Sequence, residues 1–224
     1  MLDYSLGWGF GGMHLQNILW HAASALMLFL VLRELFGSAG AALVGTLVWS
    51  VHPLRVESVV WIASRKDVIS TFFLLAALLA WIKAEPDRPG WLVASIAFLL
   101  LGASAKPSVM VFPVFALAVD LLVLRRPKRT DAYLVIVLLS FLIAVESGWA
   151  QRIGGATFYS GLIPVWYRML NACASMTVYA GNTIWPSDLA IQCMIRYPQM
   201  PRFSPVGLLA ILLAVWWMGR EIRA

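Results

Sequence analysis

Residues 109–124 read VMVFPVFALAVDLLVL, sixteen positions of which one, Asp120, is charged. A helix needs about 20 mostly apolar residues to cross the hydrocarbon core of a bilayer. The flanking helical turns bring this stretch to that length. It therefore predicts a membrane-spanning helix.

Similar apolar stretches recur along the chain, and none alternates as a barrel strand would. The predicted spans are Met13–Phe36, Ala39–Val51, Val68–Trp81, Trp91–Ala105, Val109–Leu124, Ala132–Gly148, Trp166–Ile184 and Val206–Met218. Several need flanking turns to reach full length. The sequence thus predicts an all-α, polytopic transmembrane bundle of seven or eight helices, with residues 1–224 forming a single membrane domain.

The composition supports a multi-pass membrane protein. Of the 224 residues, 61% are hydrophobic and 12% charged, and the mean hydropathy is +0.81. Soluble domains carry about twice that share of charge. This excludes an ordinary soluble globule, a disordered chain and a nucleic-acid-binding module. The net charge of +6 agrees with basic cytoplasmic loops.

Basic loop residues predict the orientation of the bundle. The cluster Arg125–Arg129 is placed in the cytoplasm, together with Arg33 and the loop Lys83–Pro89. His14, the segment His52–Asp67 and Lys106 then lie on the non-cytoplasmic side. After Gly148 two placements stay open, because residues 166–184 either span the bilayer or lie in its interface.

The cations of segment 52–67 lie on the side where few are expected. Arg55, Arg65 and Lys66 therefore need another reason to be there, and a bound anion supplies one. Since Glu57, Trp61 and Arg65 recur every four residues, a helix would put them on one face.

Two interpretations of this segment remain open. In one, an interfacial helix brings Arg65 and Lys66 to a phosphate group. In the other, a re-entrant loop contains an internal Glu57–Arg65 pair, and Asp67 caps the following helix.

A polar stripe begins the first span. His14, Asn17 and His21 share one helix face, which either lines a wet cavity or hydrogen-bonds to neighbouring helices. Two turns, about 10 Å, separate the two histidines, so no metal site is predicted.

Two charged residues lie in or next to the predicted span 109–124, Lys106 just before it and Asp120 within it. Lys106-Pro107 opens this span, where the lysine either meets an anion at the helix N-terminus or extends toward the interface. Asp120, near the other end, is expected to pair with the basic cluster 125–129.

These motifs resemble a known family. The segments His14-Leu-Gln-Asn17…His21, His52-Pro-Leu-Arg-Val-Glu57…Trp61…Arg65-Lys66-Asp67 and Lys106-Pro107…Asp120 are similar to the membrane domain of multi-pass O-mannosyltransferases with TPR repeats. In animals these enzymes target cadherins, and bacterial relatives exist. Arg168…Tyr179 and Trp185-Pro186 resemble a later segment of the family.

The resemblance implies a GT-C glycosyltransferase fold. Such enzymes move a sugar from a polyprenyl phosphate to a protein Ser or Thr hydroxyl on the non-cytoplasmic face, with inversion. It implies a lipid-linked sugar donor and a protein acceptor. No residue pattern in the sequence calls for a metal or nucleotide cofactor. On the non-cytoplasmic side we expect Arg65, Lys66 and Lys106 to bind the phosphate of the lipid donor. The residues expected to complete the binding site are His52, Glu57, Trp61, His14 and Asn17.

The sequence departs from the family in three places. The acidic catalytic residue of the family lies upstream of the matched region, so no catalytic residue is assigned here. No TPR repeat is expected within residues 1–224, and the apolar-aromatic pattern of the family is altered near Ile191-Gln-Cys193. A non-catalytic lipid-phosphate-binding or scaffold module and a transporter or flippase are the alternative functions. The Ala- and Trp-rich composition favours a bacterial inner membrane over the endoplasmic reticulum.

Overall fold

The computed structural model describes residues 9–85, 87–125, 130–155 and 164–186, together with positions 207, 209 and 213. These ranges are almost entirely helical and contain no β-strand, so the predicted all-α class is confirmed. The chain divides into two compact units, residues 1–147 and 148–224, and each is described by itself.

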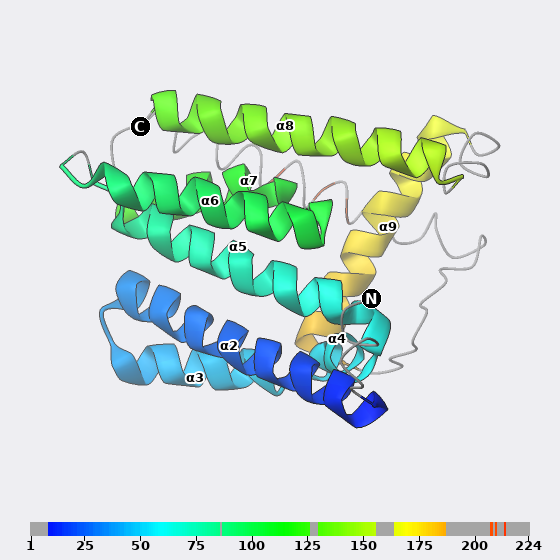
Figure 1. The fold of residues 1–224 in the computed structure, drawn as a ribbon, viewed down its shortest axis with the longest axis horizontal. Coiled ribbons are helices and arrows are strands. Elements are labelled where there is room, and N and C mark those ends of the chain that lie inside the picture. Colours follow the sequence, from blue (N-terminus) through cyan, green and yellow to red (C-terminus); the bar gives the residue numbers. More distant parts are fainter. Residues whose placement is uncertain are drawn as a thin grey trace. The chain divides into compact units, whose positions relative to one another are not determined.

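The first unit is a bundle of antiparallel helices (Figure 1). Helix α2 packs against α3 and α5, and α5 packs against α6. The predicted spans from 13 to 148 all recur as helical segments. Their bounds are α2 Phe10–Phe36, α3 Ala39–Ser50, α5 Arg65–Lys83, α6 Pro89–Ala105, η3 Pro107–Val111, α7 Phe112–Ala118, η4 Val119–Leu124 and α8 Thr130–Ile153. The predicted span 206–218 lies largely outside the described residues.

Local sequence sets the tight turn between the first two helices. Helix α2 ends at Gly37, which has a left-handed φ of 66° and donates its N–H to Arg33 O. Glycine adopts this conformation without a Cβ penalty. The hydroxyl of Ser38 then accepts a hydrogen bond from Ala41 N at 3.3 Å and caps α3.

Contacts between distant segments define the two ends of this unit. At one end Lys83 pairs with Glu34 at 3.1 Å. At the other end Lys106 pairs with Asp67. The sequence placed Lys83 on one side of the membrane and Lys106 on the other. In the structure Lys83 ends α5 and Lys106 follows the end of α6, and these two helices run antiparallel (Figure 1). Which end faces the cytoplasm stays a prediction.

The first unit has an apolar outer surface. On α8, for example, Leu134, Leu138, Phe141 and Val145 are exposed, while Ser140 is buried. Interior polar groups with an apolar exterior are typical of a protein surrounded by lipid. Segments α2, Pro107–Leu124 and α8 are long and apolar enough to cross a membrane, which supports an integral membrane protein.

Two apolar helices are shorter than a full span. Helix α6 has 17 residues, and α3 has 12. At 1.5 Å per residue, α3 is roughly 18 Å long, well below the thickness of a bilayer core. The expected flanking turns therefore do not complete α3, because its Ser38 cap and the turn at Val51 end it on both sides.

Asp120 lies in the π-helical turn η4 and is buried. Its Oδ2 accepts hydrogen bonds from Trp81 Nε1 at 3.1 Å and from the Tyr133 hydroxyl at 2.7 Å. The sequence assigned Asp120 to the basic cluster, of which residues 126–129 lie outside the described residues. Within the described part of the chain, Asp120 joins η4 to α5 and α8.

The second unit contains α9, Val165–Ile184. Pro164 precedes its first turn, where proline is favourable. Trp166, Met169 and Met176 are exposed along it, and Ala174 is buried. Helix α9 is not among the described helices long and apolar enough to span a membrane. Its two predicted placements both stay open.

Candidate functional site

The segment between α3 and α5 is not one helix. It consists of η1 Pro53–Arg55, α4 Val56–Val60 and η2 Ile62–Ser64. Trp61 has an extended backbone, with φ −81° and ψ 114°, and separates α4 from η2. The prediction that Glu57, Trp61 and Arg65 share one helix face is therefore wrong.

The physical reason is a competing hydrogen-bond donor from α2. The side-chain amide of Asn17 donates to Val59 O and Trp61 O, both at 3.2 Å. In a continuous helix these carbonyls would accept from backbone N–H groups four residues later. Asn17 is fully buried, and it holds the broken segment against α2.

The polar stripe on α2 also connects to two other segments. His21 Nε2 lies 3.0 Å from Ser50 O, and its ring stacks on Trp49 with centroids 5.2 Å apart. Ser24 donates to Val68 O at 3.3 Å. The hydrogen-bonded interpretation of the stripe is thus confirmed for Asn17 and His21. His14, one turn before Asn17, is half-buried.

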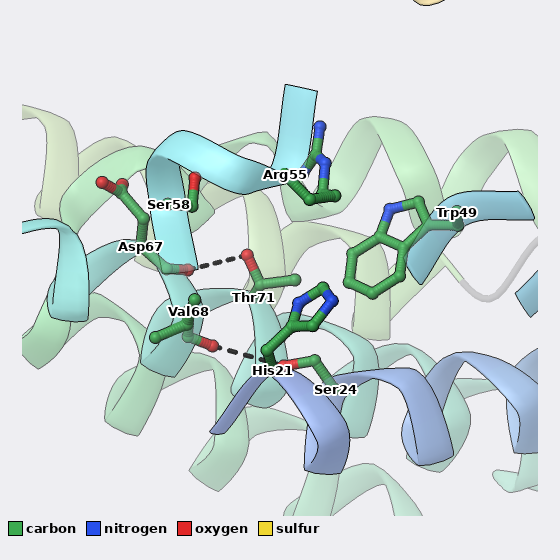
Figure 2. A pocket seen from close by; sticks show the side chains of 8 residues that line it. All are labelled: His21, Ser24, Trp49, Arg55, Ser58, Asp67, Val68 and Thr71. Carbon is green, nitrogen blue, oxygen red and sulfur yellow. Dashed lines mark hydrogen bonds between the residues drawn. The ribbon is translucent and has the colours of Figure 1, made fainter. Parts of the chain in front are cut away.

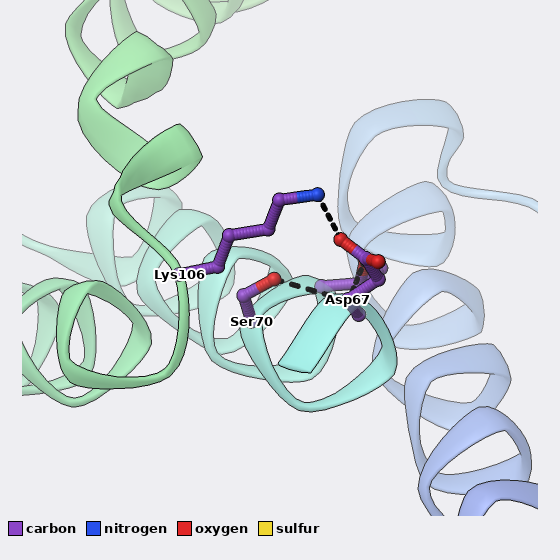
Figure 3. A network of polar contacts seen from close by, with 4 residues as sticks. Asp67, Ser70 and Lys106 are labelled. Carbon is purple, nitrogen blue, oxygen red and sulfur yellow. Dashed lines mark hydrogen bonds and ion pairs between the residues drawn. The ribbon is translucent and has the colours of Figure 1, made fainter. Parts of the chain in front are cut away.

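An ion pair joins the two main sequence motifs. Lys106 Nζ contacts Asp67 Oδ1 (Figure 3). Lys106 immediately precedes η3, and Pro107 is the first residue of η3, as predicted. Asp67 lies in the first turn of α5. The expectation that Asp67 caps this helix is wrong, because Ser64 holds the N-cap position and the Asp67 carboxylate is engaged by Lys106.

The other predicted site residues lie in the same region without converging on one point. His52 Nδ1 accepts a hydrogen bond from Leu54 N at 3.2 Å and caps η1. Arg65 is half-buried at the start of α5, whereas Glu57 and Lys66 are exposed. Their predicted roles in ligand binding stay predictions.

A small pocket lies beside these residues (Figure 2). Its volume is about 240 Å³ when its open mouth is included. The lining residues come from α2, α3, η1, α4 and α5: His21, Ser24, Trp49, Arg55, Ser58, Asp67, Val68 and Thr71. None of the eight predicted site residues lines it, although Lys106 reaches it through Asp67.

Two charged residues of this pocket, Arg55 and Asp67, were not among the predicted site residues, and Arg55 is the cation. Its guanidinium carbon lies 5.5 Å from the Trp49 ring centroid, within the range of a cation–π interaction. Burial lowers the pKa of Arg55 below its usual value. Its presence on the side where few cations are expected was a signal in the sequence.

These features define a class, a multi-pass membrane protein with a charged pocket at one end of a helical bundle. The family model for dolichyl-phosphate-mannose-protein mannosyltransferase matches residues 6–149. This is well over half of the chain, which therefore belongs to that family. The sequence-based identification of a membrane O-mannosyltransferase family is confirmed.

Curated relatives agree with the family match. The chain is 29% identical to protein O-mannosyl-transferase tmtc2 of Xenopus laevis over 175 residues, 70% of this chain and 21% of that protein. It is 25% identical to protein O-mannosyl-transferase F38B6.6 of Caenorhabditis elegans over 229 residues, 95% of this chain and 32% of that protein.

A third relative matches a shorter part, with 32% identity to human protein O-mannosyl-transferase TMTC3 over 76 residues, 34% of this chain and 8% of that protein. The chain thus spans about a fifth of the frog relative and about a third of the nematode relative. No solved structure matches it. The scaffold and transporter alternatives gain no support from these comparisons.

Proposed function

We propose that this chain is the donor-binding part of a membrane O-mannosyltransferase that transfers mannose from a polyprenyl phosphate, such as dolichyl phosphate, to a protein Ser or Thr hydroxyl. The observation that carries the proposal is the Lys106–Asp67 ion pair. It joins the two motifs that resemble the family, 39 residues apart, at one end of the bundle.

The charges at this end suit the phosphate of the donor. Arg65 and Lys66 directly precede Asp67 at the start of α5, and Arg55 lies in the adjacent pocket. A guanidinium forms two parallel hydrogen bonds with phosphate, and an ammonium acts as a point charge. The exposed apolar surface of the bundle suits the polyprenyl tail.

The proposed reaction is a substitution at the anomeric carbon. The acceptor oxygen forms the new bond to C1, the bond from C1 to the phosphate oxygen breaks, and the lipid phosphate leaves. A carboxylate takes the acceptor proton, and cations stabilise the negative charge on the departing phosphate. The family resemblance places that carboxylate upstream of the matched region, so we assign it to no residue here. The proposal invokes no metal or nucleotide cofactor.

The proposed location of the site is the non-cytoplasmic face. Which cellular membrane contains the protein is a separate question. Composition favours a bacterial inner membrane, but the relatives named above are from a frog, a nematode and human, so the comparisons give that preference no support.

Lipid binding by the purified chain in nanodiscs tests the proposal. Polyprenyl phosphate mannose should bind, and Arg65→Ala combined with Lys66→Ala should weaken binding by about tenfold or more, because charged hydrogen bonds to phosphate contribute about 1.5–3 kcal/mol each. Arg88→Ala, an exposed cation at the other end of the bundle, is the matched control. Absence of binding by the unmodified chain, or equal loss in the control, would overturn the proposal.

A further inference from the structure

The Arg55 guanidinium is a partly buried cation that lies 5.5 Å from the centroid of the Trp49 ring. Among the described residues it has no ion pair and no hydrogen bond. Desolvation alone accounts for the lowered pKa of Arg55. Removing a charge from water without a compensating partner is costly. The space in front of this guanidinium therefore suits an anion.

The same pocket contains a carboxylate with a different environment. Asp67 is held by Lys106, so this charge is balanced by the protein. Figure 2 shows Asp67 well separated from Arg55 within the pocket lining. A carboxylate accepts hydrogen bonds at both of its oxygens, and Lys106 donates to one of them, Oδ1.

Hydroxyl groups complete the lining. Ser58 has no hydrogen-bond partner in the described part of the chain and lines the pocket with Arg55 and Asp67. Thr71 donates to Asp67 O at 2.7 Å. A ligand with one negative charge and several hydroxyl groups would match both parts of the pocket. Its anionic group would meet Arg55, and its hydroxyl groups would meet the carboxylate of Asp67.

We propose that this pocket binds the phosphohexose head group of the donor, with Arg55 contacting the phosphate and Asp67 accepting hydrogen bonds from sugar hydroxyls. The proposal rests on the proposed function and assigns the two halves of its substrate to different residues. Lys106 then acts as a positioning residue through Asp67, not as a direct phosphate ligand. We place the head group at the open mouth, which the volume of about 240 Å³ includes, with the lipid tail extending outward.

Two ligands, one with and one without the sugar, separate these roles, although the sugar-free phosphate also carries close to two negative charges and not one. Dissociation constants for polyprenyl phosphate and polyprenyl phosphate mannose are measured on the full chain in nanodiscs. Arg55→Gln is expected to weaken both ligands by about tenfold, since it removes the phosphate contact. Asp67→Asn is expected to weaken only the mannose-bearing lipid, by about fivefold, and to leave polyprenyl phosphate at least as tightly bound.

Controls make each outcome decisive. Arg88→Gln, at the other end of the bundle, should change neither constant. Each variant is checked by size exclusion and thermal unfolding. If Arg55→Gln does not fold, Arg55→Lys replaces it. This variant keeps the charge, so it should weaken the binding of both lipids equally, and by less than the roughly tenfold loss expected for Arg55→Gln.

Failure of this inference and failure of the proposed function give different results. If the unmodified chain binds neither lipid, the proposed function fails. If it binds both, but Asp67→Asn lowers the two affinities equally or Arg55→Gln lowers neither, the pocket assignment is wrong and the proposed function stands.

Discussion

The side-chain amide of Asn17 donates to the carbonyl oxygens of Val59 and Trp61 and connects α2 to a segment more than forty residues further along the chain. Both distances are 3.2 Å, and Asn17 is fully buried. The contact explains why residues 56–64 form short turns and not a continuous helix. It also determines where Arg55 and Ser58 lie relative to α2.

Asn17→Ala should therefore destabilise the protein. The substitution leaves two backbone carbonyls without a donor, at a cost of about 1–3 kcal/mol for a buried polar group. We expect a lower unfolding temperature in detergent and faster proteolysis within residues 52–64. Leu15→Ala is the matched control, because Leu15 is half-exposed on α2. Equal unfolding temperatures for Asn17→Ala and the unmodified chain would contradict the argument.

The Lys106–Asp67 ion pair should show measurable coupling. Both side chains are partly exposed, at 38% and 26%, so solvent screening limits the coupling energy to about 1 kcal/mol. A double-mutant cycle with Lys106→Ala and Asp67→Ala measures it from the free energy of unfolding. The coupling should fall as the salt concentration rises.

The Arg88–Asp87 pair provides the comparison within the same chain. Its closest charged atoms are 4.0 Å apart, with side chains 67% and 75% exposed, so its cycle should give no measurable coupling. Similar coupling energies for the two pairs would show that the Lys106–Asp67 ion pair stabilises the protein no more than an exposed surface pair does.

The buried side chain of Asp120 should be energetically coupled to Tyr133, which donates a hydrogen bond to it. Tyr133→Phe removes the 2.7 Å hydrogen bond and is expected to cost about 1.5–3 kcal/mol, the range for hydrogen bonds to charged groups. In an Asp120→Ala background the same substitution should cost much less. Reversible unfolding in mixed micelles measures both values. Additive costs would mean that the hydrogen bond contributes little to stability.

Labelling of single cysteines tests the predicted orientation. With Cys173 and Cys193 replaced by Ala, Glu57→Cys and Asp87→Cys introduce exposed thiols at opposite ends of the bundle. A membrane-impermeant maleimide added to intact cells should label position 57 and not position 87. Labelling of position 87 alone would reverse the orientation inferred from the basic loops, and labelling of both would reject the spanning arrangement.

The sequence predicted the helices of the first unit well because long apolar stretches have few alternatives. Met13–Phe36 and Ala132–Gly148 correspond to α2 and α8, with errors of a few residues at the ends. Loop cations such as Lys83 and Lys106 also fell at the correct opposite ends. Both results depend on local composition, which a single sequence contains.

The arrangement of the site was less predictable because it depends on long-range contacts. Spacing placed Glu57 and Trp61 on one helix face, but the Asn17 side chain takes backbone carbonyls that such a helix needs. Lys106 was assigned to a phosphate, whereas Asp67 is its partner in the structure. Arg55 was identified as an unusual cation, but its pocket forms only when α2, α3 and α5 come together.

The lipid-facing side of α8 provides a direct test of the membrane assignment. Phe141 lies near the middle of this 24-residue helix and is 63% exposed. Phe141→Arg should disfavour insertion by about 2.5–3.5 kcal/mol, the cost of an arginine at the centre of a spanning helix. Ile153→Arg is the matched control, since Ile153 ends the helix and is also exposed, and a terminal arginine can extend to the interface. Membrane-inserted and soluble fractions are compared after cell-free synthesis with microsomes. If Phe141→Arg inserts as well as Ile153→Arg, this face of α8 does not contact lipid, and the outer apolar surface must be covered by protein.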